Sequence, residues 1–136
     1  MKMNIVLDEG ARVDRAHPND AGLDLFAMHG AVIPPCGKET IDTGVHAQIP
    51  QGYVGMIASK SGLMSKGITS RGTIDCGYTG SIKAVLYNHT HKPFRVEAGM
   101  KVTQLLIVPI AIPELNIVEE LETTDRGDGG FGSTGR

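Results

Sequence analysis

The sequence predicts an all-β domain, a jelly-roll-like β-sandwich or barrel with one short helix. Short runs of β-favouring residues recur along the chain with turn residues between them, and helical periodicity is nearly absent. The 18 glycines and 7 prolines among 136 residues punctuate these runs. Many short strands with such punctuation are typical of sandwiches and barrels.

The first three expected strands lie in the N-terminal half of the chain. Residues 4–7 are Asn-Ile-Val-Leu, and residues 31–33 are Ala-Val-Ile, directly before a Pro-Pro pair that ends the run. In residues 41–49 every second side chain is Ile, Thr, Val, Ala or Ile, and the neighbours are more polar. This period of two predicts a strand with one buried face.

Four more strands are expected, at residues 53–57, 81–88, 93–96 and 102–112. Residues 81–88 again alternate, whereas residues 102–112 are largely apolar on both faces. Such a strand needs cover on both sides. A second sheet or another subunit could provide this cover, and the sequence favours neither.

The one expected helical turn covers residues 61–66. Ser61 suits the N-cap position, and Gly67 suits the left-handed residue that follows a helix. The glycine-rich tail cannot bury enough apolar area to fold alone. We therefore expect a folded domain over residues 1–124 and a flexible arm over residues 125–136.

Bulk properties disfavour several partners. The formal net charge of −2 at pH 7 is too small for a nucleic-acid footprint. The longest apolar stretch, residues 105–112, contains Pro109 and is too short to span a bilayer, and residues 1–15 show no signal peptide. Cys36 and Cys76 are expected as reduced thiols. These features predict an intracellular protein without a nucleic-acid or membrane partner, cytoplasmic or inside a host cell if a phage or virus encodes it.

The arm has a composition that suits nucleotide binding. Flexible glycine backbone can close around phosphate oxygens, and Arg126, Ser133 and Thr134 add hydrogen-bond donors. Phe131 offers a flat ring for a base. In isolation such a tail is more often simply disordered, so its meaning depends on the rest of the chain.

Five segments of the chain carry a resemblance to a known family. In order, they are DAGLDLFA (20–27), KSGLMSKG (60–67), GTIDCGYTG (72–80), GMKVTQLL (99–106) and RGDGGFGSTG (126–135). Each is modest alone, but five in this order are specific. The chain thereby resembles the trimeric dUTP pyrophosphatase (dUTPase) family over nearly its whole length.

The resemblance implies an activity and a set of roles. The implied reaction is Mg²⁺-assisted hydrolysis of dUTP to dUMP and pyrophosphate, which limits uracil incorporation into DNA and supplies dUMP for dTMP synthesis. Asp75 would accept a proton from the water that attacks the α-phosphorus. Asp24 would contact Mg²⁺ through water. Tyr78 would lie against the deoxyribose and exclude a 2′-hydroxyl.

The resemblance also implies a homotrimer whose three active sites are shared between subunits, with the arm of one chain closing over a site built by the others. The residues implied for the triphosphate are Lys60, Ser61, Gly62, Gln104, Arg126, Ser133 and Thr134, with Gly132 beside them in the arm. The residues implied for uracil are the main chain of a hairpin around Gly72, Thr73 and Ile74, the region of Lys83, and the ring of Phe131.

The chain departs from the family pattern at two places. Lys60 stands where cellular members usually carry arginine, so the charge is kept but the bidentate fork is lost. The segment between Lys66 and Asp75 is shorter than in many relatives and lacks the asparagine that often contacts uracil.

Other classes of function remain open at this point. A dCTP deaminase shares the fold class, but its chemistry needs a glutamate, and none of the five segments contains one. A regulatory module that binds a protein partner, or a capsid-like jelly-roll without catalysis, would leave the set of acidic and arm residues without a chemical role.

Overall fold

The computed structural model describes residues 1–135, so Arg136, the last residue of the predicted arm, lies outside it. Within the described residues the chain forms twelve strands and one helix. They are β1 (Ile5–Leu7), β2 (Val13–Asp14), β3 (Leu23–Phe26), β4 (Ala31–Ile33), β5 (Lys38–Asp42), β6 (Val45–Ala47), β7 (Tyr53–Ala58), α1 (Ser61–Met64), β8 (Ile68–Ser70), β9 (Gly72–Ile74), β10 (Lys83–Asn88), β11 (Phe94–Val96) and β12 (Lys101–Pro109). No helix of this described part is long and apolar enough to cross a membrane.

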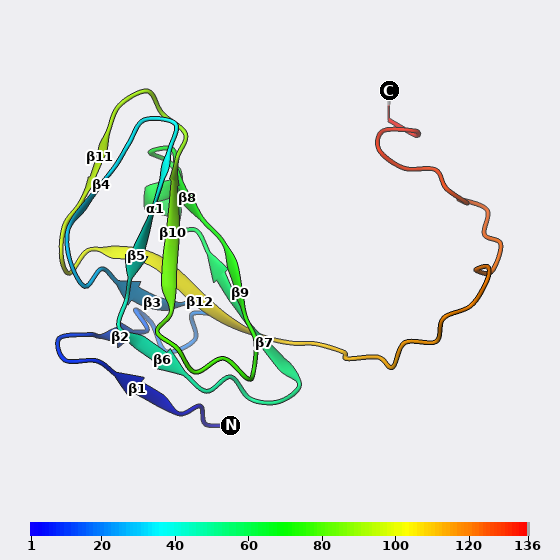
Figure 1. Ribbon diagram of the computed structural model, residues 1–136, viewed down its shortest axis with the longest axis horizontal. Coiled ribbons are helices and arrows are strands. Elements are labelled where there is room, and N and C mark those ends of the chain that lie inside the picture. Colours follow the sequence, from blue (N-terminus) through cyan, green and yellow to red (C-terminus); the bar gives the residue numbers. More distant parts are fainter. Residues whose placement is uncertain (136) are drawn as a thin grey trace.

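The strands form four small antiparallel sheets. The largest has five strands in the order β2-β3-β12-β7-β9, and a three-stranded sheet has the order β5-β10-β8. Two further pairs of strands, β1-β6 and β4-β11, lie at the margins of the folded body (Figure 1). The predicted all-β, jelly-roll-like class with one short helix is therefore confirmed.

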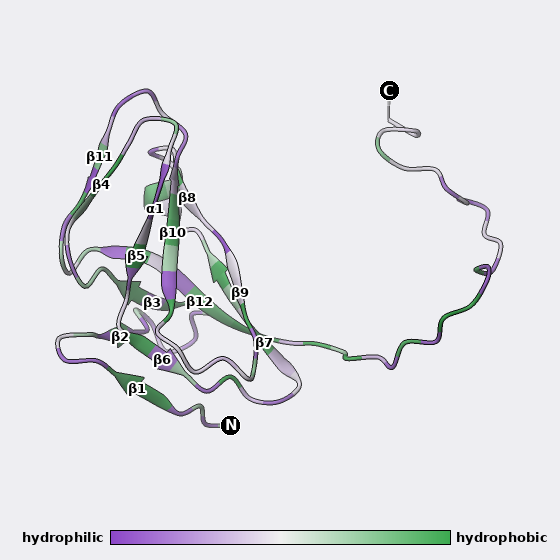
Figure 2. Ribbon diagram, viewed as in Figure 1, coloured by the Kyte–Doolittle hydropathy of each residue, from purple (hydrophilic) through white to green (hydrophobic). Residues whose placement is uncertain are grey.

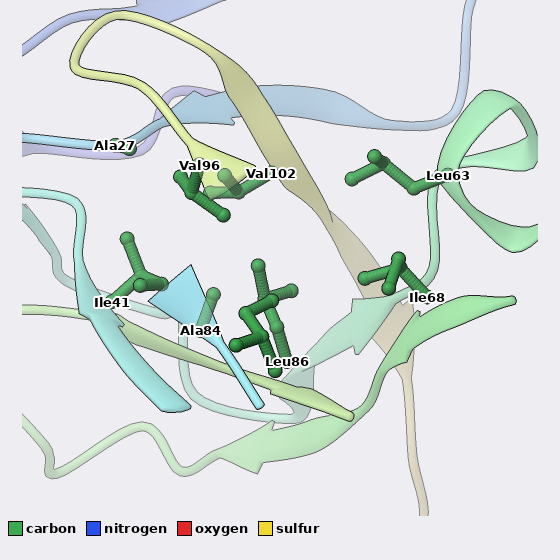
Figure 3. Close-up of a cluster of buried hydrophobic side chains, with 9 residues drawn as sticks. Ala27, Ile41, Leu63, Ile68, Ala84, Leu86, Val96 and Val102 are labelled. Carbon is green, nitrogen blue, oxygen red and sulfur yellow. The ribbon is translucent and has the colours of Figure 1, made fainter. Parts of the chain in front are cut away.

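Two apolar clusters fill the space between the sheets. One gathers around Ile41, Leu86 and Val102, and its side chains converge from different strands in Figure 3. The other contains Leu25 and Leu105, both fully buried. Fully burying a side chain of this size contributes roughly 1.5–3 kcal/mol, so these clusters fix the sheets that carry the polar residues described below.

The prediction of one strand over residues 41–49 is wrong, because the chain turns a corner within it. β5 ends at Asp42 and β6 starts at Val45, and the two strands belong to different sheets. Gly44 adopts a φ of +65°, a left-handed conformation that glycine tolerates best. The hydroxyl of Thr43 donates to the carbonyl of Ile82 at 2.6 Å, which holds the corner in place.

The predicted hairpin around Gly72 is also wrong in its pairing. β8 pairs with β10, whereas β9 pairs with β7, so these neighbouring strands enter different sheets. The strands β2, β3, β8 and β9 were not predicted from the sequence; each has only two to four residues, too few for a clear alternation. Cys36 and Cys76 are free, exposed thiols.

β12 is shorter at its C-terminal end than predicted, and it stops at Pro109. Its Leu105 and Ile107 face a core cluster, whereas Leu106 and Val108 point to the outer face and stay half-buried. One face is thus covered by this chain, and the other is only partly covered.

From residue 110 onward the described chain has no strand or helix and extends away from the body (Figure 1). The predicted boundary between residues 124 and 125 falls inside this extended segment. Figure 2 shows hydrophobic residues along it. Its exposed apolar side chains before the predicted arm are Ile110, Ile112, Leu115, Ile117, Val118 and Leu121.

Candidate active site

A buried carboxylate held by two lysines forms the centre of the first group of site residues. Asp24 lies in β3 between Leu23 and Leu25, which face the core, so its side chain points to the opposite face of the sheet. That side chain is only 3% exposed. Lys60 Nζ lies 2.5 Å from its Oδ1, and Lys101 Nζ lies 3.2 Å from its Oδ2. Both carboxylate oxygens therefore face an ammonium group.

The lysines keep Asp24 ionised. Burial is the largest single influence on the pKa of Asp24 and would raise it, but the hydrogen bonds and charges of Lys60 and Lys101 together lower the pKa below its ordinary value. Roles for Asp24 and Lys60 were predicted from the sequence, whereas Lys101 was missed. Lys101 lies within the fourth of the five segments, but only the register of β12 against β3 shows that it reaches Asp24.

Gln104 lies beside this group, directly across from Asp24 in the β12–β3 pairing. Its amide nitrogen donates to the carbonyl of Ser59 at 2.9 Å, which places it next to Lys60. Gly22 makes room for it, since a Cβ on Gly22 would lie 2.0 Å from Gln104 Oε1. Asp24, Lys60 and Gln104, predicted from three separate segments, are thus brought together.

A chain of hydroxyl groups supports the same corner from inside. Ser59 Oγ donates to the carbonyl of Ser70 and accepts the Ser70 N–H, both at 2.9 Å. The Ser70 hydroxyl is 2.7 Å from that of Thr103, which in turn donates to the carbonyl of Ala58 at 3.0 Å. Ser70 and Thr103 are buried. These bonds tie the end of β7, where Lys60 follows, to β8 and β12, and no sequence pattern indicated them.

Ser61 and Gly62 begin α1 directly after Lys60, and both are exposed. The predicted N-cap at Ser61 is wrong: Lys60 occupies the cap position, and no side chain caps the helix. The four-residue turn instead holds Ser61 and Gly62 at the surface beside the buried Asp24. Hydroxyl and backbone donors next to two lysines form a surface that can receive an anion.

A second group of predicted residues surrounds Asp75. β9 pairs with β7 along one side only, and it is the edge strand of the five-stranded sheet. Asp75 follows β9 and is exposed, and it begins a loop of residues 75–82, which we call the Asp75 loop. Tyr78, 42% exposed, donates its hydroxyl to the carbonyl of Ser81 at 2.8 Å and lies over Gly80.

The end of the Asp75 loop is anchored to the corner between β5 and β6. The hydroxyl of Ser81 donates to Asp42, and the Ile82 N–H donates to the carbonyl of Val45 at 2.8 Å. The Ser81 hydroxyl, followed by the Gly44 N–H, lowers the pKa of Asp42 below its ordinary value. Lys83 follows as the first residue of β10, exposed and paired with Asp42 in the β10–β5 ladder.

One chain does not bring Asp24 and Asp75 together. β12 and β7 lie between β3 and β9, so at about 4.8 Å per strand the backbones of β3 and β9 are roughly 14 Å apart across the sheet. The two aspartates are also displaced along it, because Asp24 is level with Ala58, whereas Asp75 follows Ile74, which pairs with Gly55. The two groups of residues are therefore separate within one chain.

The predicted arm residues form a third group, distant from both (Figure 1). Arg126 Nε donates to the carbonyl of Gly129 at 2.7 Å within the arm itself. Phe131 is fully exposed, with a φ of +51°, and Gly132 follows with a φ of +89°. Ser133 and Thr134 are exposed beyond it. These side chains contact neither Asp24 nor Asp75 in the described chain.

Comparison with known proteins gives a consistent answer. The dUTPase family model matches residues 8–135. The deoxyuridine 5′-triphosphate nucleotidohydrolase of Clostridium tetani is 40% identical over 100% of this chain and 97% of its own. A mutant dUTPase of Staphylococcus bacteriophage 80alpha with dUpNHpp has a TM-score of 0.90 and 34% identity, covering 99% of both chains. The dUTPase of Staphylococcus aureus phage phi11, in a mutant that reveals coordination of a structural Mg(II) ion, has a TM-score of 0.83 and 33% identity over 90% of this chain and all of its own.

Proposed function

This chain belongs to the dUTPase family, and from that premise we propose that it hydrolyses dUTP to dUMP and pyrophosphate at sites shared between three copies. The observation that carries the shared site is the separation of Asp24 from Asp75 within one chain. A hydrolytic site needs its base and its phosphate-binding cations around a single substrate. Different copies must then supply the two groups.

In the proposed reaction Asp75 accepts a proton from a water molecule. The water oxygen forms a bond to the α-phosphorus, and the bond from the α-phosphorus to the bridging oxygen of the β-phosphate breaks. The leaving group is pyrophosphate, and dUMP remains. A general base of this kind contributes roughly 10²–10⁴-fold to the rate. Asp75 suits this role because it is exposed at the surface of an anchored loop.

The phosphate chain is proposed to bind at the group around Asp24. Lys60 and Lys101 supply positive charge there, and Ser61 and the Gly62 backbone supply donors at the adjacent surface. Gln104, fixed by Gly22 and Ser59, is positioned beside them. Preorganised donors of this type stabilise the charge that moves to the leaving group.

The residues of this group also fit Mg²⁺. The described residues contain no cluster of three metal-ligating side chains, which suits an ion that arrives on the triphosphate and keeps its waters. Asp24 is ionised, and each of its oxygens forms an ion pair with a lysine. Its carboxylate would also accept hydrogen bonds from those waters. When bound, Mg²⁺ would neutralise phosphate charge.

Uracil is proposed to bind at the open edge of β9. Gly72, Thr73 and Ile74 pair with β7 on one side, so their other main-chain groups can face a base. Fixed donors and acceptors reject a base of the wrong polarity, because buried polar groups would be left unpaired. Tyr78 would lie against the deoxyribose and exclude a 2′-hydroxyl, and Lys83 would lie near the base.

The arm is proposed to close the site. Arg126 has a guanidinium for the outer phosphates, and Ser133 and Thr134 add hydroxyl donors around the Gly132 backbone. Phe131, exposed here, would stack on uracil. A segment that orders over its substrate excludes water from the reaction.

Apolar surface left open in one chain supports the homotrimer. On the outer face of the five-stranded sheet, Leu106 lies opposite Met56 and Val108 opposite Val54, and Met56 is 44% exposed. The extended segment of residues 110–121 carries six more large, exposed apolar side chains. Exposed apolar surface of this extent is typical of permanent interfaces.

The proposal is tested by pyrophosphate release from dUTP, dCTP, dTTP and UTP with Mg²⁺. We expect dUTP to be hydrolysed far faster than the other three, and equal release from all four would contradict the specificity. Asp75→Asn should bind dUTP and keep its oligomeric state while turnover falls about 10²–10⁴-fold. Glu39→Gln, which changes an exposed carboxylate on β5, serves as the control.

Such an enzyme limits uracil incorporation into DNA and supplies dUMP for dTMP synthesis. Both consequences follow from the substrate and product of the proposed reaction.

A further inference from the structure

His46 connects the Asp75 loop to the N-terminal part of the chain. It lies in β6, with its side chain 28% exposed. Its ring nitrogen Nδ1 is 2.8 Å from the carbonyl oxygen of Thr79, and its Nε2 is 3.0 Å from Oδ1 of Asp8. Asp8 is itself fixed, because its N–H donates to the carbonyl of Gly44 at 2.9 Å.

Both partners of the ring are hydrogen-bond acceptors. A carbonyl oxygen never donates, and an ionised carboxylate only accepts. A neutral imidazole carries one N–H, so it can satisfy Thr79 or Asp8 but leaves a nitrogen lone pair facing the other oxygen. Only the imidazolium ion donates to both, so this arrangement selects the protonated ring.

We propose that His46 is a positioning residue for the Asp75 loop. As an imidazolium it ties Thr79 to Asp8, and loss of its proton releases this tie as the pH rises. Thr79 directly follows Tyr78, so the tie fixes the part of the loop that is assigned to the sugar. The consequence for catalysis rests on the proposed hydrolysis of dUTP, whereas the protonation itself does not.

The carboxylates around His46 also favour its protonated form. β1 leads into Asp8, β5 ends at Asp42, and the Asp75 loop presents the Thr79 carbonyl. Lys83 and His29 act on Asp42. The Thr79 carbonyl is the largest influence on the pKa of His46 and raises it; partial burial opposes this, and Asp8 and Asp42 raise the pKa further. The pKa of His46 thus lies above its ordinary value.

The sign of the pH effect follows from this direction. A raised folded-state pKa means that the tie is fully present below the ordinary histidine pKa of about 6.5 and is lost as the pH rises through the folded-state value. Asp75 must lose its proton to act as a base, so its effect on activity runs the opposite way. Loss of the His46 tie should therefore appear as a separate decline on the alkaline side.

The first test needs no substrate. NMR titration of histidine-labelled protein should show that the pKa of His46 lies above the ordinary histidine value of about 6.5. The Tyr78 N–H, which donates to the carbonyl of Asp75 at 3.1 Å, should become less protected from hydrogen exchange as His46 loses its proton. A His46 pKa at or below the ordinary value, or a Tyr78 amide indifferent to the titration of His46, would overturn the proposal.

Asp8→Asn is the sharpest variant. The introduced side-chain amide can donate to Nε2 of a neutral ring while Nδ1–H donates to Thr79, so the tie no longer needs the extra proton. We expect the His46 pKa to fall and the alkaline decline in kcat/KM for dUTP to disappear, with activity retained at high pH. An unchanged pH profile in Asp8→Asn would contradict the role assigned to the pair.

His46→Gln removes the titration and at least one of the two bonds. We expect KM for dUTP to rise about three- to tenfold, as for one lost hydrogen bond, with a smaller change in kcat and no alkaline decline. His17→Gln should behave as the native chain. If dUTP is not hydrolysed but His46 titrates as expected, the proposed function is wrong and the His46 tie stands. If dUTP is hydrolysed but His46 does not titrate as expected, only the His46 tie is wrong.

Discussion

Gly22 and Gln104 meet so closely that a single added carbon would occupy the place of the glutamine side chain. The ideal Cβ position on Gly22 lies 2.0 Å from Gln104 Oε1, well inside any real contact. The backbone of Gly22 is not in the left-handed region, so an alanine there would clash with Gln104 without straining the backbone. This glycine therefore determines where Gln104 points.

We expect Gly22→Ala to displace Gln104 and break its bond to the Ser59 carbonyl. Because the displaced atoms end a flexible side chain, the loss of unfolding free energy should stay below about 1 kcal/mol. The value of kcat/KM should fall as far as in Gln104→Ala, and the double variant should be no worse than either. Steady-state kinetics and urea unfolding measure both effects. Native activity in Gly22→Ala would show that the position of Gln104 is irrelevant.

Asp24→Asn should make the free energy of unfolding less dependent on pH in the acid range. The lowered pKa of Asp24 means that its ionised form stabilises the fold above the unfolded-state pKa of about 3.9, and this contribution is lost as the pH falls through the lower folded-state value. The variant should lose about 1.5–3 kcal/mol at pH 7, as expected for hydrogen bonds between charged groups. Below the folded-state pKa the difference should vanish.

Urea unfolding between neutral and acid pH, at fixed protein concentration, measures this difference. Glu39→Gln is the control, since it changes an exposed carboxylate on β5 and should alter stability little. If the unfolding free energies of Asp24→Asn and the native chain differed by the same amount at every pH, the ionisation of Asp24 would not stabilise the fold.

Thr103→Val tests the buried hydroxyl chain. Valine keeps the shape of threonine but leaves the Ser70 hydroxyl without its partner at 2.7 Å. An unsatisfied buried group costs about 1–3 kcal/mol, and the end of β7 before Lys60 should loosen, so both unfolding free energy and dUTP affinity should fall. Thr69→Val, which removes an exposed contact to His89, is the control. Equal effects in the two variants would argue against a special role for the buried chain.

Sequence patterns predicted the class of fold and most of the longer strands because those strands alternate or end at proline. They failed at Gly44, where one alternating run crosses between two sheets, and at β3, whose four residues contain the disfavoured Asp24. The predicted site residues came from the resemblance in five segments. Lys101 escaped prediction because the pairing of β12 with β3 brings it to Asp24, and Ser70 escaped because its partner Thr103 lies in a different sheet.

Two inactive variants should restore activity to each other if sites are shared. Asp75→Asn lacks the base but keeps the arm, and a chain ending at residue 124 lacks the arm but keeps Asp75. In mixed trimers, a site can take Asp75 from the truncated chain and the arm from the other. Random assortment gives both groups to roughly a quarter of the sites in an equal mixture. The variants would be unfolded in urea together, refolded, and assayed for pyrophosphate release from dUTP.

The control mixture combines Asp75→Asn with Asp75→Ala, which lack the same group and cannot complete a site in any combination. Refolding each variant alone gives the baseline. Activity in the first mixture that merely equals the sum of the separate variants would mean that Asp75 and the arm act within one chain. Full activity of the truncated chain alone would instead remove the arm from the mechanism. Recovery in the first mixture alone is expected, because one chain keeps Asp75 far from Asp24 and its arm far from both.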